Sequence, residues 1–159
     1  MQRILFVCTG NICRSPTAEG LFRARLAAIG LADRFEADSA GTAGYHVGER
    51  PSAPAIRIAA EYGVDLGRLR ARRLEAVDFA RFDLALGMDR GHLEAMRGLA
   101  PAGRRAKLGL LLDYAPALPL REVPDPYYGG DGDYRRSFEL IAAGIDGLIK
   151  ALAQTMASA

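Results

Sequence analysis

Short apolar segments typical of buried strands alternate with helical segments along this chain. Such strands are expected at 4–7, 35–41, 82–86 and 108–112. A first helix is predicted to begin at Ser15-Pro16, read as N-cap and first helical position, and to end at Gly30. Further helices are predicted at about 51–62, at about 89–99, and along the apolar stripe 138–156. This alternation predicts a doubly wound α/β fold, a four-stranded parallel sheet with helices on both faces. Ligands of such sheets bind beyond the carboxyl ends of the strands.

Length, charge and cysteine content narrow the classes of function. A chain of 159 residues is expected to form a single domain spanning 1–159. A net charge of +2 argues against a dedicated nucleic-acid-binding protein. The apolar runs are expected to be too short for a membrane span or a signal peptide, which predicts a cytoplasmic protein. In a reducing cytoplasm, the two cysteines point to catalysis, metal binding or redox sensing.

The polar loop after the first strand carries the densest chemistry. Cys8 ends the strand, and Gly10 and Asn11 permit the unusual backbone angles that let successive N–H groups converge on an anion. The dipole of the following helix adds a positive field, which favours the nucleophilic thiolate of Cys8. Arg14 can direct two N–H donors at one oxyanion. The loop is therefore predicted to bind and attack a phosphoryl group.

Other interpretations of this loop are weaker. The glycine pattern of a Walker A motif or of a dinucleotide-binding fingerprint does not occur. A zinc site would have to combine Cys8 and Cys13 with His46 and His92, and their spacing does not fit zinc fingers. Neither a metal nor another cofactor is expected.

The segment V-C-T-G-N-I-C-R-S-P resembles the signature of the low-molecular-weight protein tyrosine phosphatases. Asp125-Pro126-Tyr127-Tyr128 resembles the general-acid loop of that family, and the segment D-S-A-G-T at 38–42 resembles another segment of the family. The resemblance implies a cysteinyl-phosphate intermediate on Cys8, with Arg14 clamping phosphate and Asp125 as general acid and base. It also implies substrate contacts from the loop and from aromatic walls, which gives this substrate-binding set: Thr9, Gly10, Asn11, Ile12, Cys13, Ser15, Tyr45, Tyr127 and Tyr128.

The resemblance assigns supporting roles to two further residues and leaves one gap. Ser39 is expected to hold Asn11, and Asp89 is expected to orient Arg14. Leu69 stands where the family often has a histidine that braces the asparagine, so the brace must come from elsewhere. His46 and His92 receive no catalytic role. The arginines around 68–73 are interpreted as a solvated basic face.

Several functions remain open. The favoured substrate is a phosphotyrosine-containing protein, with a bacterial tyrosine kinase as one candidate partner and a monomer as the favoured state. Protein arginine phosphatases share the fold but tend to have threonine in place of Ile12. Thiol-dependent arsenate reductases need later cysteines, and none follows Cys13. A non-catalytic oxyanion-binding module is the alternative outside enzymes. A disulfide between Cys8 and Cys13 is a further hypothesis, which would protect the nucleophile from peroxide.

Overall fold

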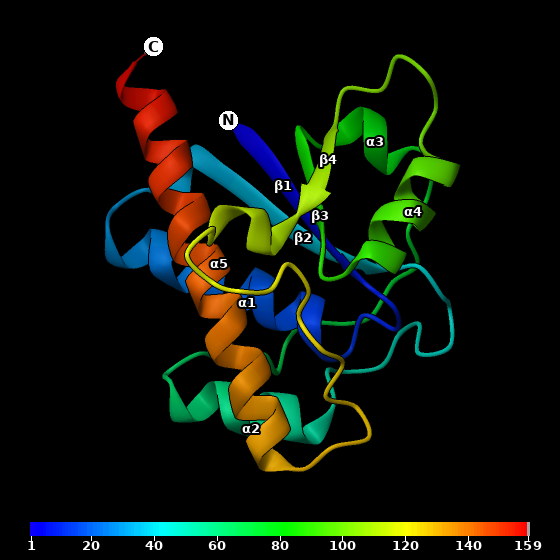
Figure 1. Ribbon diagram of the computed structural model, residues 1–159, viewed down its shortest axis with the longest axis vertical. Helices are drawn as coiled ribbons and strands as arrows, with labels where there is room; N and C mark the ends of the chain where they lie inside the picture. Colours follow the sequence, from blue (N-terminus) through cyan, green and yellow to red (C-terminus); the bar gives the residue numbers. More distant parts are fainter. Residues whose placement is uncertain (159) are drawn as a thin grey trace.

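Four parallel strands form the central sheet of the computed structural model, which describes residues 1–158 (Figure 1). Their spatial order is β2-β1-β3-β4, so the chain leaves β1 to one side and later returns to its other side. The strands are β1 Gln2–Cys8, β2 Phe35–Gly41, β3 Leu84–Gly87 and β4 Lys107–Leu110. The reversal of direction next to β1 is the switch point at which such folds bind ligands.

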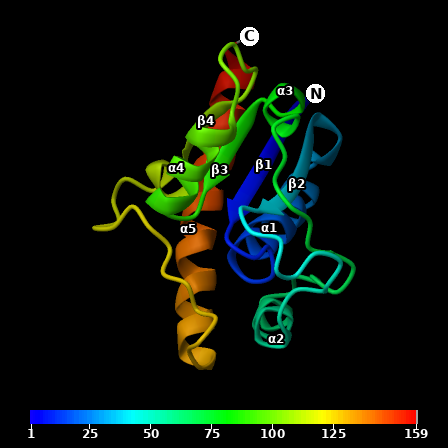
Figure 2. The same ribbon diagram turned by 90° about the vertical axis from the view of Figure 1, so that its right-hand side faces the viewer.

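Helices cover both faces of this sheet, as the sequence predicts. The α-helices are α1 Arg14–Ala28, α2 Ala53–Glu61, α3 Asp78–Arg81, α4 Arg90–Leu99 and α5 Asp131–Ala157, and the 3₁₀ turns are η1 Ala32–Arg34 and η2 Leu111–Tyr114. In both views α5 ends at the end of the molecule at which β1 begins (Figures 1 and 2). The start of α5 therefore lies toward the carboxyl ends of the strands, where the ligand is expected.

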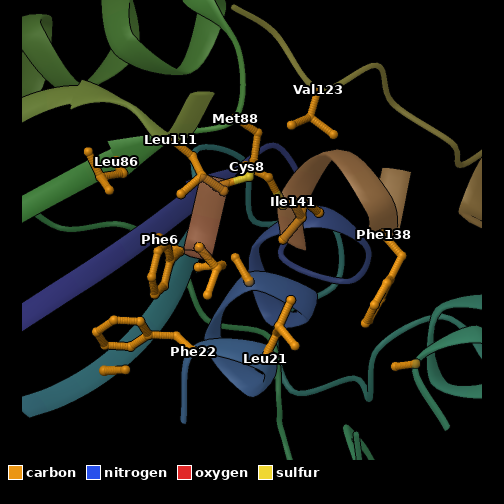
Figure 3. Packing of buried hydrophobic residues seen from close by; sticks show 14 of the residues in the cluster. Phe6, Cys8, Leu21, Phe22, Leu86, Met88, Leu111, Val123, Phe138 and Ile141 are labelled. Carbon is orange, nitrogen blue, oxygen red and sulfur yellow. The ribbon is translucent and has the colours of Figure 1, made fainter. Parts of the chain in front are cut away.

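Alternate side chains of β1 enter two separate hydrophobic cores. Ile4 and Phe6 belong to the larger core, which α1 and α5 cover, while Leu5 and Val7 belong to the smaller core under α3 and α4. In the larger core Phe6 meets Phe22 of α1 edge to face, with 5.6 Å between ring centroids. Figure 3 shows Cys8 among Met88, Leu111 and Ile141 at the upper end of this core. Burial on both faces explains why β1 is continuously apolar.

The predicted elements exist, with shifts at their ends. Strand 35–41 has the predicted bounds, whereas the third and fourth strands lie at Leu84–Gly87 and Lys107–Leu110, and residues 111–112 belong to η2 instead. Gly30 and Gly63 follow α1 and α2 with φ of 76° and 80°, as expected of glycines that end helices. The short helix α3 was not predicted, because four residues cannot show a helical period.

Helix α5 is long and apolar enough to cross a membrane by length and composition alone, although the sequence was expected to contain no such segment. Its apolar stripe instead packs within the molecule. Phe138, Ile141, Ile145 and Leu148 are buried in the larger core. The hydropathy of α5 is that of a core helix with one solvated side.

Candidate active site

The loop between β1 and α1 lies at the switch point of the sheet. Asn11 has a φ of 59°, and among residues 1–158 it is the one residue other than glycine in the left-handed region. Helix α1 begins at Arg14, with Cys13 at the N-cap position. The prediction that Ser15 caps the helix is therefore wrong. Ser15 lies inside the first turn, and its hydroxyl contacts Cys8 and Asn11.

The side-chain amide of Asn11 organises those partners. The backbone N–H of Arg72 donates to Asn11 Oδ1 at 3.0 Å, which fixes the orientation of the amide. Asn11 Nδ2 then donates to Ser15 Oγ at 2.8 Å and to Ser39 Oγ at 2.9 Å. Because Ser15 Oγ accepts this bond, its own proton is free to donate to Cys8 Sγ, 3.0 Å away. The loop thus directs a hydrogen-bond donor at the sulfur.

A buried glutamate completes this network on the far side. Ser39 Oγ donates to Glu19 Oε1 at 2.7 Å, and Arg23 pairs with the other carboxylate oxygen. Burial raises the pKa of Glu19, although Ser39 and Arg23 act in the opposite direction. The sequence reading missed Glu19 and the Arg72 amide. Leu69 stands where the family often has a histidine that contacts the asparagine. In this protein the backbone N–H of Arg72 holds Asn11, and Leu69 packs against the larger core.

Arg14 is held rigidly although it is charged and only 3% exposed. Its Nη1 donates to Asp89 Oδ2 at 2.9 Å and to the carbonyl oxygen of Val123 at 2.8 Å. Burial disfavours the charged form of Asp89, but His92 and Arg14 outweigh it and hold the pKa of Asp89 below its usual value. The predicted pairing of Asp89 with Arg14 is present. The contact with the Val123 carbonyl could not be predicted from the sequence, because any residue at that position has a backbone carbonyl.

Asp125 lies on the loop before α5 and reaches the same arginine. Its Oδ2 is 3.6 Å from Arg14 Nη2, and its Oδ1 accepts the backbone N–H of Tyr127 at 3.1 Å. Half of its side chain, 49%, is exposed to solvent. A carboxylate at the mouth of a site can exchange protons with water and with a bound molecule.

These segments enclose a cavity of about 130 Å³ above the loop. Tyr127 and Tyr128 meet edge to face at 4.8 Å, and the ring of His46 lies 6.0 Å from that of Tyr127. His46 was not predicted to belong to the site. The cavity unites all three proposed catalytic residues with most of the proposed substrate contacts, and its lining is Cys8, Thr9, Gly10, Ile12, Cys13, Arg14, Tyr45, His46, Asp125, Tyr127 and Tyr128. Asn11, Ser15, Ser39 and Asp89 stand behind this lining.

Cys13 faces a polar pair at the edge of the cavity. Its Sγ lies 3.3 Å from Ser52 Oγ and 3.5 Å from the hydroxyl of Tyr134. Burial raises the pKa of the Cys13 thiol and that of Tyr134, the latter to about 12. Both cysteines are free thiols, so a disulfide with Cys8 stays a prediction. Within residues 1–158 no three acidic, cysteine or histidine side chains are grouped as metal ligands.

A doubly wound sheet that brings a thiol and a buried arginine to one loop at its switch point has the groups that phosphoryl transfer requires, which is the class of a phosphatase. Residues 3–158 match the family "Low molecular weight phosphotyrosine protein phosphatase". A low molecular weight protein-tyrosine-phosphatase of Streptomyces coelicolor is 46% identical over 94% of this chain and 93% of its own. The chain belongs to this family, and it is a phosphoric monoester hydrolase.

Solved structures agree with this assignment over nearly the whole chain. A protein tyrosine phosphatase from Entamoeba histolytica superposes with a TM-score of 0.93 at 29% identity, covering 98% of this chain and 99% of the other. A Drosophila arginine phosphatase superposes with a TM-score of 0.88 at 28% identity, covering 96% and 98%. The expected single α/β domain architecture is confirmed by the first of these likenesses.

Proposed function

We propose that this enzyme hydrolyses phosphotyrosine in proteins through a phosphocysteine intermediate on Cys8. The observation that carries the proposal is the convergence of Cys8, Arg14 and Asp125 on one cavity. Arg14 supplies a positive charge already fixed by Asp89, and Ser15 supplies a donor to the sulfur. A preorganised charge of this kind stabilises a phosphoryl group in transfer without reorganising during the reaction.

The reaction divides into two displacements at phosphorus. In the first, the Cys8 thiolate forms a bond to phosphorus, the bond to the tyrosine oxygen breaks, and Asp125 gives its proton to the departing phenolate. In the second, Asp125 takes a proton from water, the water oxygen bonds to phosphorus, and the S–P bond breaks. Ser15 stabilises the departing thiolate, and inorganic phosphate leaves.

The walls of the cavity favour an aryl phosphate. Three tyrosine side chains of the walls are exposed, so their rings are available to a flat phenyl group. The exposed fraction is 79% for Tyr45, 41% for Tyr127 and 95% for Tyr128. Ile12 is buried in the cavity lining, and its aliphatic side chain has no group with which to orient a water molecule. These features favour phosphotyrosine over phosphoarginine. A phosphorylated tyrosine kinase as partner and a cytoplasmic location belong to the same proposal.

The test compares phosphotyrosine, phosphoserine and phosphoarginine peptides of one sequence in steady-state turnover. The phosphotyrosine peptide is expected to have the highest kcat/KM. Cys8→Ser should retain the fold and phosphate affinity but lose turnover by more than about a hundredfold, because a serine hydroxyl without an adjacent base is a weak nucleophile. Asp146→Asn, an exposed change on α5, is the control and should match the wild type. Turnover by Cys8→Ser near the wild-type rate would contradict the covalent mechanism.

A further inference from the structure

His92 is a buried histidine at the start of α4, beside the loop that carries the nucleophile. Its ring nitrogen Nδ1 accepts the backbone N–H groups of Met88 at 3.2 Å and of Asp89 at 3.1 Å. In return the backbone N–H of His92 donates to Asp89 Oδ1 at 3.0 Å. Gly87 makes room for this arrangement, because a Cβ at that position would lie 2.9 Å from the Cβ of His92. The position of the ring is therefore set by backbone groups.

These contacts determine which ring nitrogen carries a proton. A proton on Nδ1 would collide with the two amide hydrogens that point at it, even though Asp89 Oδ1 lies 3.3 Å from Nδ1. Burial, and then the charge of Arg14, lower the pKa of His92 to about 4. The ring is therefore neutral near pH 7, and its single N–H is on Nε2.

The partner of this N–H is the hydroxyl of Thr9, whose Oγ1 lies 2.9 Å from His92 Nε2. Arg14 Nη2 lies 3.5 Å from the same nitrogen, but both groups carry hydrogens and do not bond. Thr9 Oγ1 therefore accepts, and its own proton needs a different acceptor. Nothing within residues 1–158 hydrogen-bonds to Oγ1 apart from His92. Thr9 lines the cavity, so an uncommitted donor stands at the edge of an anion site.

We propose that His92 is a positioning residue, and that through it the Thr9 hydroxyl becomes a hydrogen-bond donor to an oxygen of the bound phosphoryl group. The ligand of this subsite is a tetrahedral oxyanion, either the phosphoryl group of the substrate or the phosphate product. His92 itself stays neutral, so the positive charge at the site comes from Arg14. The inference rests on the proposed function, because it names a further contact to the same anion.

Two changes at Thr9 test the donor. Binding of inorganic phosphate is measured by titration calorimetry at pH 7. Thr9→Val keeps the shape of the side chain but removes the hydroxyl, and it should weaken phosphate binding by about tenfold or more, the usual value of a hydrogen bond to a charged group. Thr9→Ser keeps the hydroxyl and should bind within about threefold of the wild type. Equal affinities of Thr9→Val and the wild type would overturn the proposal.

A double-mutant cycle tests the role of His92. In His92→Asn the amide oxygen can still accept the Met88 and Asp89 N–H groups, but no donor reaches Thr9. This variant should also weaken phosphate binding, and the variant combining His92→Asn with Thr9→Val should bind no more weakly than Thr9→Val alone. If the losses of phosphate affinity in the two single variants add in the double variant, His92 acts only on the structure and not through Thr9. ¹⁵N NMR of the wild type gives a readout independent of folding, since a proton on Nδ1 at pH 7 would contradict the proposal.

Phosphate binding requires no turnover, so this test is separate from that of the proposed function. A wild type that hydrolyses phosphotyrosine while Thr9→Val binds phosphate normally would remove only the Thr9 contact. A wild type that binds phosphate through Thr9 but hydrolyses none of the three peptides would remove the proposed function and leave the anion subsite.

Discussion

At the scale of single residues, the site depends on polar atoms whose roles are fixed by their neighbours. Asn11 can direct its amide N–H groups at Ser15 and Ser39 only because the Arg72 backbone holds its oxygen. The sequence predicted Asn11, Ser39 and Asp89 as companions of the loop, and all three side chains make hydrogen bonds there. It placed Thr9 among the substrate contacts but gave His92 no role, because the contact of His92 with Thr9 depends on a tautomer set by two backbone amides distant in sequence from the loop.

Asp125 is expected to act as an acid only where the leaving group needs a proton. Asp125→Asn should slow phosphorylation of Cys8 by phosphotyrosine by about 10²–10⁴-fold, because a phenolate whose conjugate acid has a pKa near 10 is a poor leaving group. The loss should shrink as the leaving group becomes less basic. Single-turnover rates on a series of aryl phosphates measure this trend, and Asp146→Asn, an exposed change on α5, serves as control. A loss that is equal across the series would assign the proton to another donor.

His92 should make the folded state sensitive to mild acid. The unfolded chain takes up a proton at this residue near pH 6.5, whereas the folded protein does so only near pH 4. Arg14 opposes that proton, and Asp89, Asp125 and Glu122 favour it, but burial dominates. The free energy of unfolding contributed by this group is therefore complete above pH 6.5 and falls as the pH drops toward 4.

The measurement is urea unfolding of the wild type and of His92→Asn at several pH values. The variant is expected to be less stable near pH 7 and to lose less stability between pH 6.5 and 4. Parallel curves for the two proteins across this window would show that His92 is not the group that titrates.

At the scale of elements, the pattern of strands and helices was predictable because each has its own hydrophobic period. The long stripe on α5 and the alternation in β2 were sufficient to place both. The ends were harder, since they depend on tertiary contacts. Helix α1 starts at Arg14, one residue before Ser15, whose hydroxyl contacts Cys8 and Asn11. Strand β4 ends at Leu110, where Asp113 of η2 accepts the Leu110 N–H.

Two glycines of α5 should respond oppositely to alanine. A Cβ on Gly147 would lie 1.7 Å from the carbonyl oxygen of Tyr114, so Gly147→Ala must push α5 away from η2 and should cost about 1–3 kcal/mol or more. A Cβ on Gly132 meets nothing within 4 Å, and Gly132→Ala should be neutral or stabilise by up to about 1 kcal/mol. Thermal unfolding of both variants checks this, and equal melting temperatures would contradict the close contact.

At the scale of the whole molecule, the site draws on segments that are far apart in the chain. Three segments meet at Arg14: the loop before α1, Asp89 before α4, and Val123 with Asp125 before α5. The sequence predicted this meeting only through the family resemblance and the rule for strand ends. The particular contacts depend on how three loops pack, and no local pattern specifies that.

Phosphate should therefore stabilise the entire fold. A ligand held at the point where these segments meet binds the folded state alone, and at a concentration about 100 times its dissociation constant it adds about 2.7 kcal/mol. For a chain of this size, that corresponds to a rise in Tm of about 5–10 °C. Arg14→Lys loses the paired donors, so its Tm should rise much less when phosphate is added. The Tm of each protein in buffer without sulfate or phosphate is the reference. An unchanged rise in Arg14→Lys would mean that phosphate binds elsewhere.

The contact between Arg14 and the Val123 carbonyl also bears on how this enzyme is made. During synthesis the first loop leaves the ribosome early, when the guanidinium of Arg14 has neither its carbonyl nor its aspartate partner. Those partners emerge more than 70 residues later, at 89 and 123. Until then the nascent chain carries a bare thiol beside an untethered cation. The contacts that fix Arg14 beside the first loop can therefore form only after most of the chain has been synthesised.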